Sequence, residues 1–406
     1  MYRDLQGFFK TFRNLPLTDF ILEYTDDNIG ILNTHSSNLS KKGIFFRLLS
    51  FFRKSILSSS FYKPKIDQES ILIISNSVNE HEASLSLQEI ENTPVFFIGS
   101  TPNKHHINCY VLGFLLLPLI LLKIYKEADN RTIVSLPYTL DQLMISTGLY
   151  FYYRKLFSKQ ISLLVISNHL SPETRAAMLL AKEHNIKIVY IQHSQLVSKY
   201  PPIECDIFFL TGEDSKRKLS NINGKLDDSK VHLIGSPKLD RYSIKKIHSL
   251  DEISICINPG ANYKRVTDLI FSLKKKFVTS KISIRPHPGL RKEYILPYKS
   301  LMSKGIALIT PDKESLLDFM ERSDVVISDD SGIFYEAGYV GNLSLSYRMS
   351  SYSKDWYDLE GSEIHKIYDS PQELINRLTE MLSLEDNVRD DFKIFFSNIG
   401  TLYDNK

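Results

Sequence analysis

The sequence lacks the short motifs that many nucleotide-dependent and metal-dependent enzymes carry. It contains no Asp-x-Asp, no Walker A loop, no glycine-rich Gly-x-Gly-x-x-Gly after a predicted strand, and no Gly-x-Ser-x-Gly elbow. Its three cysteines, Cys109, Cys205 and Cys256, lie far apart and share no metal-ligand spacing. We therefore expect no dedicated metal site, no cofactor and no disulfide framework, which suits a reducing cytoplasm.

Strong charge is absent as well. The net charge of +3 over 406 residues is too small to indicate nucleic-acid binding. A chain of this length has room for two or three domains with their own cores. Residues 1–20 have charges spread through them and no long apolar core, so we expect no signal peptide.

Long hydrophobic runs are also missing. The longest, CYVLGFLLLPLILL at residues 109–122, falls short of the about 20 residues that a membrane-spanning helix needs. It predicts a buried helix with a kink near Pro118, because proline removes a helix hydrogen bond. A dip into one face of a membrane is the alternative.

Acidic residues are absent from residues 28–66, and this gap contains a basic segment, residues 41–65. Apolar side chains recur there at helical spacing between the bases. The apolar positions are Phe45, Leu48, Leu49, Phe52 and Ile56, and the basic ones are Lys41, Lys42, Arg47, Arg53, Lys54, Lys63 and Lys65. This pattern predicts a basic amphipathic helix. The helix either lies on an anionic membrane surface or packs its apolar stripe on the domain with its bases in water.

From residue 70 onward the sequence alternates predicted strands and helices. The predicted strands are residues 71–75, 95–99, 132–136, 163–167, 188–192, 207–211, 231–235, 253–257, 282–285, 307–309, 325–328 and 344–347. Predicted helices include residues 172–184, 266–277, 315–322 and 371–382. Apolar strands that alternate with helices favour parallel sheets covered on both faces. We predict an α/β fold of two Rossmann-like doubly wound domains, residues 1–245 and 246–406, facing a cleft at their strand ends.

A histidine between two prolines follows one strand of the second predicted domain, in the segment IRPHPG at residues 284–289. His287 is a candidate to donate a hydrogen bond to a phosphate as negative charge develops on a leaving nucleotide. Arg285 would add positive charge, and Pro288 would stiffen the turn. The alternative is a histidine with a purely structural role.

Two hydroxyls follow the neighbouring strand, in the segment ISDDSG at residues 327–332. Ser328 and Ser331 lie at a predicted helix start, where unpaired N–H groups and the helix dipole favour a phosphate. Gly332 would let the ligand approach the backbone, and Glu336 on the following helix is a candidate to bind a ribose hydroxyl. The alternative is a simple N-cap, for which serine and aspartate are preferred.

Candidates for acceptor chemistry lie at strand ends of the first predicted domain. His193 follows the predicted strand 188–192, and Glu173 opens the helix after the segment Ser167-Asn168-His169. An inverting transferase needs a base that takes the proton of the acceptor hydroxyl, and Glu173 and His193 are the first choices for it. Asn79-Glu80-His81-Glu82 follows the first predicted strand.

With these pieces in place, the chain resembles the two-domain GT-B glycosyltransferases of bacterial surface polysaccharides. The resemblance is to CMP-sialic acid transferases and polysialyltransferases, CMP-Kdo capsule transferases and CDP-glycerol glycerophosphotransferases. His287-Pro288 matches their His-Pro motif, and Ser328 and Ser331 in SDDSGIFYEAG match their paired hydroxyls. GSPKLD at residues 235–240 looks like the segment that closes their first domain. The acidic pair plus glycine that serves the sialyltransferases as base has no counterpart here.

This resemblance implies that the histidine and the hydroxyls hold the phosphate of a cytidine nucleotide donor. The expected function is transfer of an acidic sugar, sialic-acid-like or Kdo-like, from a CMP donor to a surface glycan or lipid-linked glycan. A CDP-glycerol or CDP-ribitol phosphotransferase is a second reading. The SDDSG segment also looks like UDP-GlcNAc 2-epimerases, so a UDP-sugar transferase or 2-epimerase is a third. A non-catalytic scaffold subunit is the alternative of another class.

Overall fold

The computed structural model describes residues 2–17, 43–57, 59–61, 66, 68–85, 87, 93–99, 104–127, 130–158, 161–197, 200–236, 239, 247, 249–329, 331–350 and 366–383. It forms two compact units, residues 1–193 with 203–209 and residues 194–202 with 210–406. The predicted boundary after residue 245 stays a prediction, since residues 240–246 lie outside the described part. So do Lys41, Lys42, Lys63 and Lys65, Asp330, and positions 237, 238 and 240 of the GSPKLD segment.

The first sheet has six strands in the order β3-β2-β5-β6-β7-β8. These strands are β2 Ser70–Ser75, β3 Val95–Gly99, β5 Ile161–Ile166, β6 Lys187–Ile191, β7 Ile207–Leu210 and β8 Val231–Leu233. All pairs from β3 to β7 are parallel. Their isoleucine, leucine and valine side chains are largely buried, as expected of a parallel sheet between helices. The helices that follow these strands are α4 Val78–Ser84, α8 Pro172–Glu183 and α9 Glu213–Asn223.

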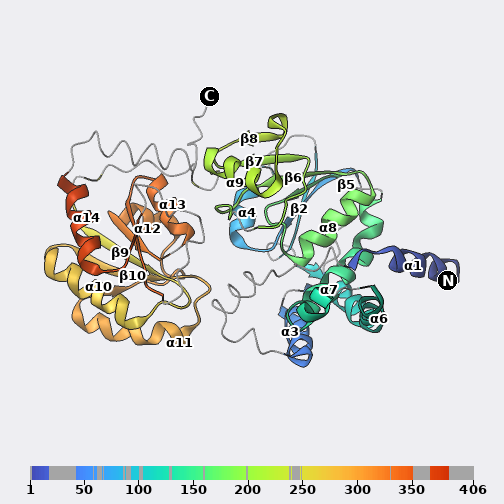
Figure 1. Ribbon diagram of the computed structural model, residues 1–406, viewed down its shortest axis with the longest axis horizontal. Helices are drawn as coiled ribbons and strands as arrows, with labels where there is room; N and C mark the ends of the chain where they lie inside the picture. Colours follow the sequence, from blue (N-terminus) through green and yellow to red (C-terminus); the bar gives the residue numbers. More distant parts are fainter. Residues whose placement is uncertain are drawn as a thin grey trace. The chain divides into compact units, whose positions relative to one another are not determined.

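A group of helices, with a short two-stranded sheet, accompanies the first sheet. The helices are α1 Tyr2–Asn14, α3 Ile44–Leu57, α5 Ile107–Leu115, α6 Leu117–Glu127 and α7 Asn130–Phe157, and the strands are β1 Ser59–Ser60 and β4 His105–His106. Helix α7 packs against α3, α5 and α8. The α5 contact is close because it uses glycines: a Cβ on Gly148 would lie 1.9 Å from the Cys109 carbonyl oxygen. Figure 1 shows α3 and α6 on either side of α7.

Two predictions about this region were wrong. Residues 132–136, predicted as a strand, lie in the 28-residue helix α7. A short segment rich in β-branched residues, such as TIVSL, cannot by itself distinguish strand from helix. The run 109–122 forms two helices, α5 and α6, bent by 54° at Leu116, so the predicted kink near Pro118 is confirmed. The predicted burial is wrong, because Phe114, Leu115 and Leu122 are 43%, 65% and 51% exposed. The bend falls close to Pro118, as a helix-breaking proline predicts.

The second sheet also has six parallel strands, in the order β11-β10-β9-β12-β13-β14. Its strands are β9 Glu252–Ile257, β10 Lys281–Pro286, β11 Ala307–Leu308, β12 Val325–Ser328, β13 Leu343–Tyr347 and β14 Ile367–Tyr368. Its helices are α10 Tyr263–Lys276, α11 Lys292–Ile295, α12 Leu316–Arg322, α13 Gly332–Tyr339 and α14 Pro371–Ser383, with a 3-10 helix at Leu296–Lys304.

Helices cover both faces of the second sheet. Ile253, Ile255 and Ile257 of β9 pack with α10 and α14, whereas Cys256, between them, packs with α12 and α13. Figure 1 shows α10 and α14 on the side of this sheet away from α12 and α13. The predicted α/β fold of two Rossmann-like doubly wound domains is confirmed.

In each sheet the strand order defines one switch point, where the direction of the connections reverses and a ligand is expected. In the second sheet the chain runs from β9 to β10 and β11 on one side, then crosses to β12 on the other side of β9. In the first sheet β2 has β3 on one side and β5 on the other. Connections lead away from such a switch point in both directions and leave a crevice at the carboxyl ends of the two strands.

Candidate functional site

The three loops at the switch point of the second sheet start side by side. Ser328 of β12 pairs with Cys256 of β9, and Cys256 pairs with Arg285 of β10. The segments that follow these residues therefore leave the sheet at the same edge. His287 and the segment from Ser328 to Gly332, 41 residues apart in sequence, are brought to that edge by strand register.

His287 is held in one tautomer by its own turn. Its backbone N–H donates to the Ile257 carbonyl oxygen at 2.9 Å, which ties the turn to β9. The ring Nδ1 accepts the Gly289 backbone N–H at 3.0 Å, so Nδ1 carries no hydrogen. In the neutral ring the hydrogen is on Nε2, a donor suited to a phosphate oxygen. His287 is exposed as a whole, but partial burial of its ring lowers the pKa, which favours this neutral form near pH 7.

The two hydroxyls are not used as N-caps. Ser331 occupies the N-cap position of α13, but its side chain makes no hydrogen bond to the helix. Ser328 is 1% exposed, and its Oγ has no hydrogen-bond partner among the described residues. A buried hydroxyl without a partner is uncommon and calls for a missing acceptor or donor. The capping alternative is therefore wrong for Ser331, and both hydroxyls suit a bound oxyanion.

The neighbours of these serines have different surroundings. The buried Asp329 accepts the backbone N–H groups of Met349 at 3.1 Å and Ser350 at 2.8 Å, so it fixes the loop after β13. Gly332 is half-buried at the first position of α13, and Glu336 is half-buried one turn later. Both lie on the element that starts at the switch point, in agreement with their expected placement.

Arg285 is engaged inside the second unit. Its Nη1 lies 2.9 Å from Glu314 Oε2, its guanidinium stacks on Phe319, and it is 8% exposed. Arg322 binds the same Glu314 carboxylate through Nε at 2.7 Å. The guanidinium thus contributes to a buried ion-pair network, and its predicted contact with donor phosphate stays a prediction. Pro288 is exposed beside His287.

The loop after β9, residues 258–262, also reaches this edge and was not predicted as part of the site. Gly260 has φ +101°, a conformation that favours glycine, and an added Cβ there would meet nothing within 4 Å. Asn262 caps α10 by accepting the Arg265 N–H at 3.2 Å. The signal in the sequence was Asn-Pro-Gly-Ala-Asn directly after the first strand of the domain. Such a loop lets a ligand approach the backbone.

At the switch point of the first sheet, polar side chains surround a buried carboxylate. Glu80 is 3% exposed and accepts the Asn76 backbone N–H at 2.8 Å, the Ser77 hydroxyl at 3.2 Å and the Asn168 amide at 3.4 Å. The Asn76 amide also donates to Ser171 Oγ at 2.8 Å. Glu80 was not among the predicted site residues, because its position in the site depends on β2 lying beside β5.

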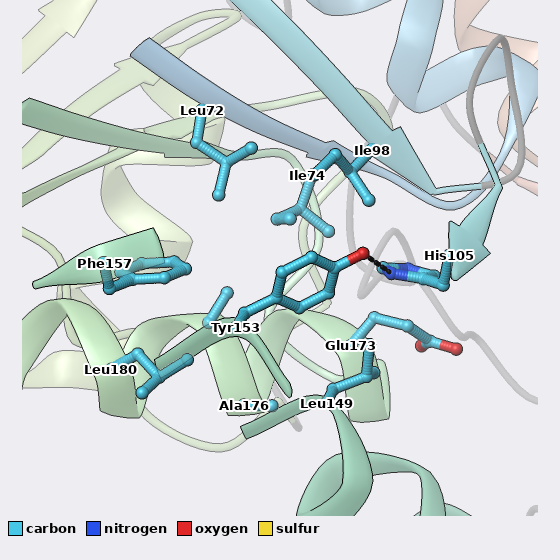
Figure 2. A pocket seen from close by; sticks show the side chains of 11 residues that line it. Leu72, Ile74, Ile98, His105, Leu149, Tyr153, Phe157, Glu173, Ala176 and Leu180 are labelled. Carbon is cyan, nitrogen blue, oxygen red and sulfur yellow. Dashed lines mark hydrogen bonds between the residues drawn. The ribbon is translucent and has the colours of Figure 1, made fainter. Parts of the chain in front are cut away.

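Glu173 opens α8 next to this cluster and lines a small pocket beneath the sheet (Figure 2). The pocket is mostly apolar, with room for roughly one water molecule. Figure 2 shows the Glu173 carboxylate at the same end as His105, away from Phe157 and Leu180. Burial raises the pKa of Glu173, and Glu80 raises it further, while Ser171 and Lys54 oppose the shift. A carboxyl group with a raised pKa is suited to proton transfer near neutral pH.

His193, the second predicted base, follows β6 at the same edge. Its Nδ1 donates to the Ser167 carbonyl oxygen at 2.5 Å, because a carbonyl can only accept. The neutral ring then carries its lone pair on Nε2, the state required of a base. Ser167 binds His193, and its neighbour Asn168 binds Glu80. His193 and Glu80 are therefore both tied to the end of β5. The assignment of the base to Glu173 or His193 stays a prediction.

Comparisons with known proteins identify the fold. No protein-family model matches the chain, and no curated protein sequence matches it. The UDP-GlcNAc 2-epimerase from Neisseria meningitidis, solved with UDP-GlcNAc bound, is similar with a TM-score of 0.52 and 16% identity, covering 82% of this chain and 95% of that one. A kitacinnamycin glycosyltransferase is similar with a TM-score of 0.52 and 9% identity, covering 84% and 97%. The fold is therefore that of the GT-B class, and at these identities the likeness shows the fold alone.

Two further observations concern metal binding and membrane association. Among the described residues no group of three or more histidine, cysteine or acidic side chains is arranged to hold a metal ion. No single helix in the described part is long and apolar enough to cross a membrane, although the bent pair α5 and α6 passes that test when taken together.

Proposed function

We propose that this protein is a glycosyltransferase that moves an acidic sugar, sialic-acid-like or Kdo-like, from a CMP donor to a surface glycan or lipid-linked glycan. The observation that carries the proposal is the convergence at one switch point of the His287 turn and the Ser328 hydroxyl, which has no partner among the described residues. A hydrogen-bond donor of fixed tautomer and two hydroxyls not used as caps suit a phosphate. The three free cysteines agree with action in a reducing cytoplasm.

In the proposed reaction the bond between the anomeric carbon and the phosphate oxygen breaks, and CMP leaves with the bonding electrons. His287 Nε2–H, Ser328 and Ser331 would stabilise the negative charge that develops on the phosphate. The acceptor hydroxyl would attack the anomeric carbon and pass its proton to Glu173 or His193. Glu336 would bind the ribose, and hydrogen bonds rather than a metal ion would stabilise the leaving phosphate.

Nucleotide binding tests the donor half of this proposal. A ligand that binds only the native state raises its stability, by about 2.7 kcal/mol at a hundred times its Kd. We expect CMP to raise the melting temperature, UMP to raise it less, and His287→Ala to remove the CMP effect. His232→Ala, which changes an exposed histidine on β8, is the matched control and should keep it. An unchanged CMP shift in His287→Ala would contradict the donor assignment.

The same nucleotide-binding assay and a donor-turnover assay distinguish the alternative functions. A stronger response to uridine than to cytidine nucleotides would favour the UDP-sugar transferase or 2-epimerase reading. A CDP-glycerol or CDP-ribitol phosphotransferase would respond to CDP-alditols and not to CMP-sugars. A scaffold subunit would neither hydrolyse nor transfer any donor as an isolated chain.

A further inference from the structure

Helix α3 turns its apolar side outward. Phe45, Phe46, Leu49, Phe52, Ile56 and Leu57 are between 43% and 76% exposed. At 100° per residue these positions fall on one side of the helix. The opposite side, with Phe51 at 1% and Arg47 at 7% exposure, is the buried one. A helix of a protein in water buries its apolar side, so this arrangement is reversed.

Ion pairs to helix α7 hold α3 in this orientation. Asp141 of α7 is fully buried and lies 2.9 Å from Lys54 Nζ and 3.5 Å from Arg47 Nη1. Phe51 contacts Tyr110 of α5 from the same side. Two of the bases that suggested a lipid-binding helix in the sequence therefore anchor α3 to the protein. Arg53 is exposed and lies within the apolar arc.

The apolar surface continues from α3 onto α5 and α6. The rings of Phe52 and Phe114 lie 5.3 Å apart and join the two parts. Exposed residues then recur at helical spacing along α5 and α6, at Val111, Phe114, Leu115, Leu121, Leu122 and Tyr125. We call these six side chains, with the six of α3, the outer apolar face. Twelve large apolar side chains on three helices, of which α3 contacts α5 and α5 contacts α6, exceed the scattered exposure that is normal for a monomer.

Charge on and around the outer apolar face is basic. Helices α3 and α5 contain no acidic residue. Lys104 donates to the Leu57 carbonyl at the end of α3, and Lys126 is exposed near Tyr125. The only acidic residue of α6, Glu127, pairs with Lys123 at 3.4 Å. Along the sequence, Lys41 and Lys42 precede α3, and Lys63 and Lys65 follow it.

We propose that the outer apolar face lies on an anionic lipid bilayer. Its aromatic and aliphatic side chains would enter the boundary between headgroups and acyl chains, and Arg53 would extend to the lipid phosphates. The described bases on and around the face, Arg53, Lys104 and Lys126, favour this occupant over a second copy of the chain, because the same bases of that copy would repel them. The proposal does not depend on the reaction.

The helices lie in the plane of the membrane in this proposal and do not cross it. Helices α5 and α6 are bent by 54°, and only one side of each is exposed. Lys123 points into the protein, where its Nζ donates to the Phe12 carbonyl at 3.3 Å. The inner sides of both helices are thus occupied by protein contacts.

Flotation of the full chain with vesicles tests the proposal. We expect binding to phosphatidylcholine vesicles that contain phosphatidylglycerol, and little binding to phosphatidylcholine alone. F45S/L49S/I56S should lower the partition coefficient at least about tenfold, because it removes three apolar side chains from the buried layer. Its matched control is V278S/Y294S/M302S, which removes three equally exposed apolar side chains from the second unit. Because all six positions are exposed, both variants should keep the wild-type melting temperature.

A second pair of variants tests the charge. Arg53→Gln should weaken binding about fivefold, in keeping with about 1 kcal/mol per base at an anionic surface, and added salt should reduce the difference. Lys276→Gln, an exposed base of α10, should have no effect. Equal losses in both triple variants, or equal binding to the two vesicle types, would overturn the proposal. So would a dimer without vesicles that F45S/L49S/I56S dissociates, since the face would then bind a second copy.

Discussion

The backbone around His287 determines which of its two ring nitrogens carries the hydrogen. The Gly289 N–H donates to Nδ1, and a protonated ring carries hydrogen on both nitrogens. Protonation therefore breaks this hydrogen bond and replaces a neutral donor with a cation. The glycine at position 289 favours this contact, because an added Cβ would lie 3.3 Å from Nδ1 and crowd the ring.

This geometry predicts a pH-dependent stability. The pKa of His287 in the folded protein is lowered by burial from its usual 6.5, so the unfolded chain binds more protons between the two values. The stability that the residue contributes is complete above pH 6.5 and declines as the pH falls through the lowered value. We expect the melting temperature of His287→Gln to fall less than that of the wild type between pH 7 and pH 5. Parallel curves for the two proteins would show that the ring does not titrate in this way.

For Glu173 we expect the opposite pH dependence of stability, and also an effect on activity. Its folded pKa is raised, mainly by burial, so its contribution to stability is complete at low pH and is lost as the pH rises past 4.5 toward the raised value. Glu173→Gln should therefore melt at a higher temperature than the wild type at pH 7 and at a similar one at pH 4. If Glu173 is the base, transfer by the variant should fall by about 100-fold or more. Unchanged transfer would assign the base to another residue at this edge.

At the scale of the element, α13 and α12 begin with serines in different roles. Ser315 caps α12, with its Oγ accepting the Asp318 N–H at 3.1 Å, whereas Ser331 makes no such bond to α13. Ser315→Ala should cost about 1 kcal/mol of unfolding free energy and leave CMP binding unchanged. Ser331→Ala should have the reverse effect. Urea unfolding and calorimetric titration of both variants measure this contrast, and a stability loss in Ser331→Ala without a binding loss would restore the capping role.

Elements could be predicted where the local pattern determines them, and not where distant contacts do. The strands around residues 253–257 and 325–328 were identifiable because their apolar runs are short and end in turn residues. The outward apolar side of α3 could not be predicted, because it depends on the pairing of Lys54 with Asp141, 87 residues away. The helix at residues 132–136 was missed because a β-branched run looks the same at the start of a long helix.

For the molecule as a whole, the candidate site of the second sheet was more predictable than that of the first. His287 and Ser328 each follow a recognisable strand, and neighbouring parallel strands bring their ends together. Glu80 and Asn168 are 88 residues apart in sequence and are neighbours only because β2 pairs with β5. No sequence motif predicts that pairing. The loop 258–262 was missed because it contains neither a histidine nor a hydroxyl; its signal in the sequence is a proline and a glycine directly after a strand.

A nucleotide bound at the switch point of the second sheet should protect three segments that are far apart in sequence. Hydrogen exchange should slow in residues 257–262, 286–290 and 329–336 when CMP is added, because all three leave the same edge of one sheet. Residues 76–80 and 167–173 follow strands of the other sheet and should exchange as before. His287→Ala should remove the protection in all three segments together, since they contact one ligand. Protection of one segment alone would mean that the three loops do not form a common site.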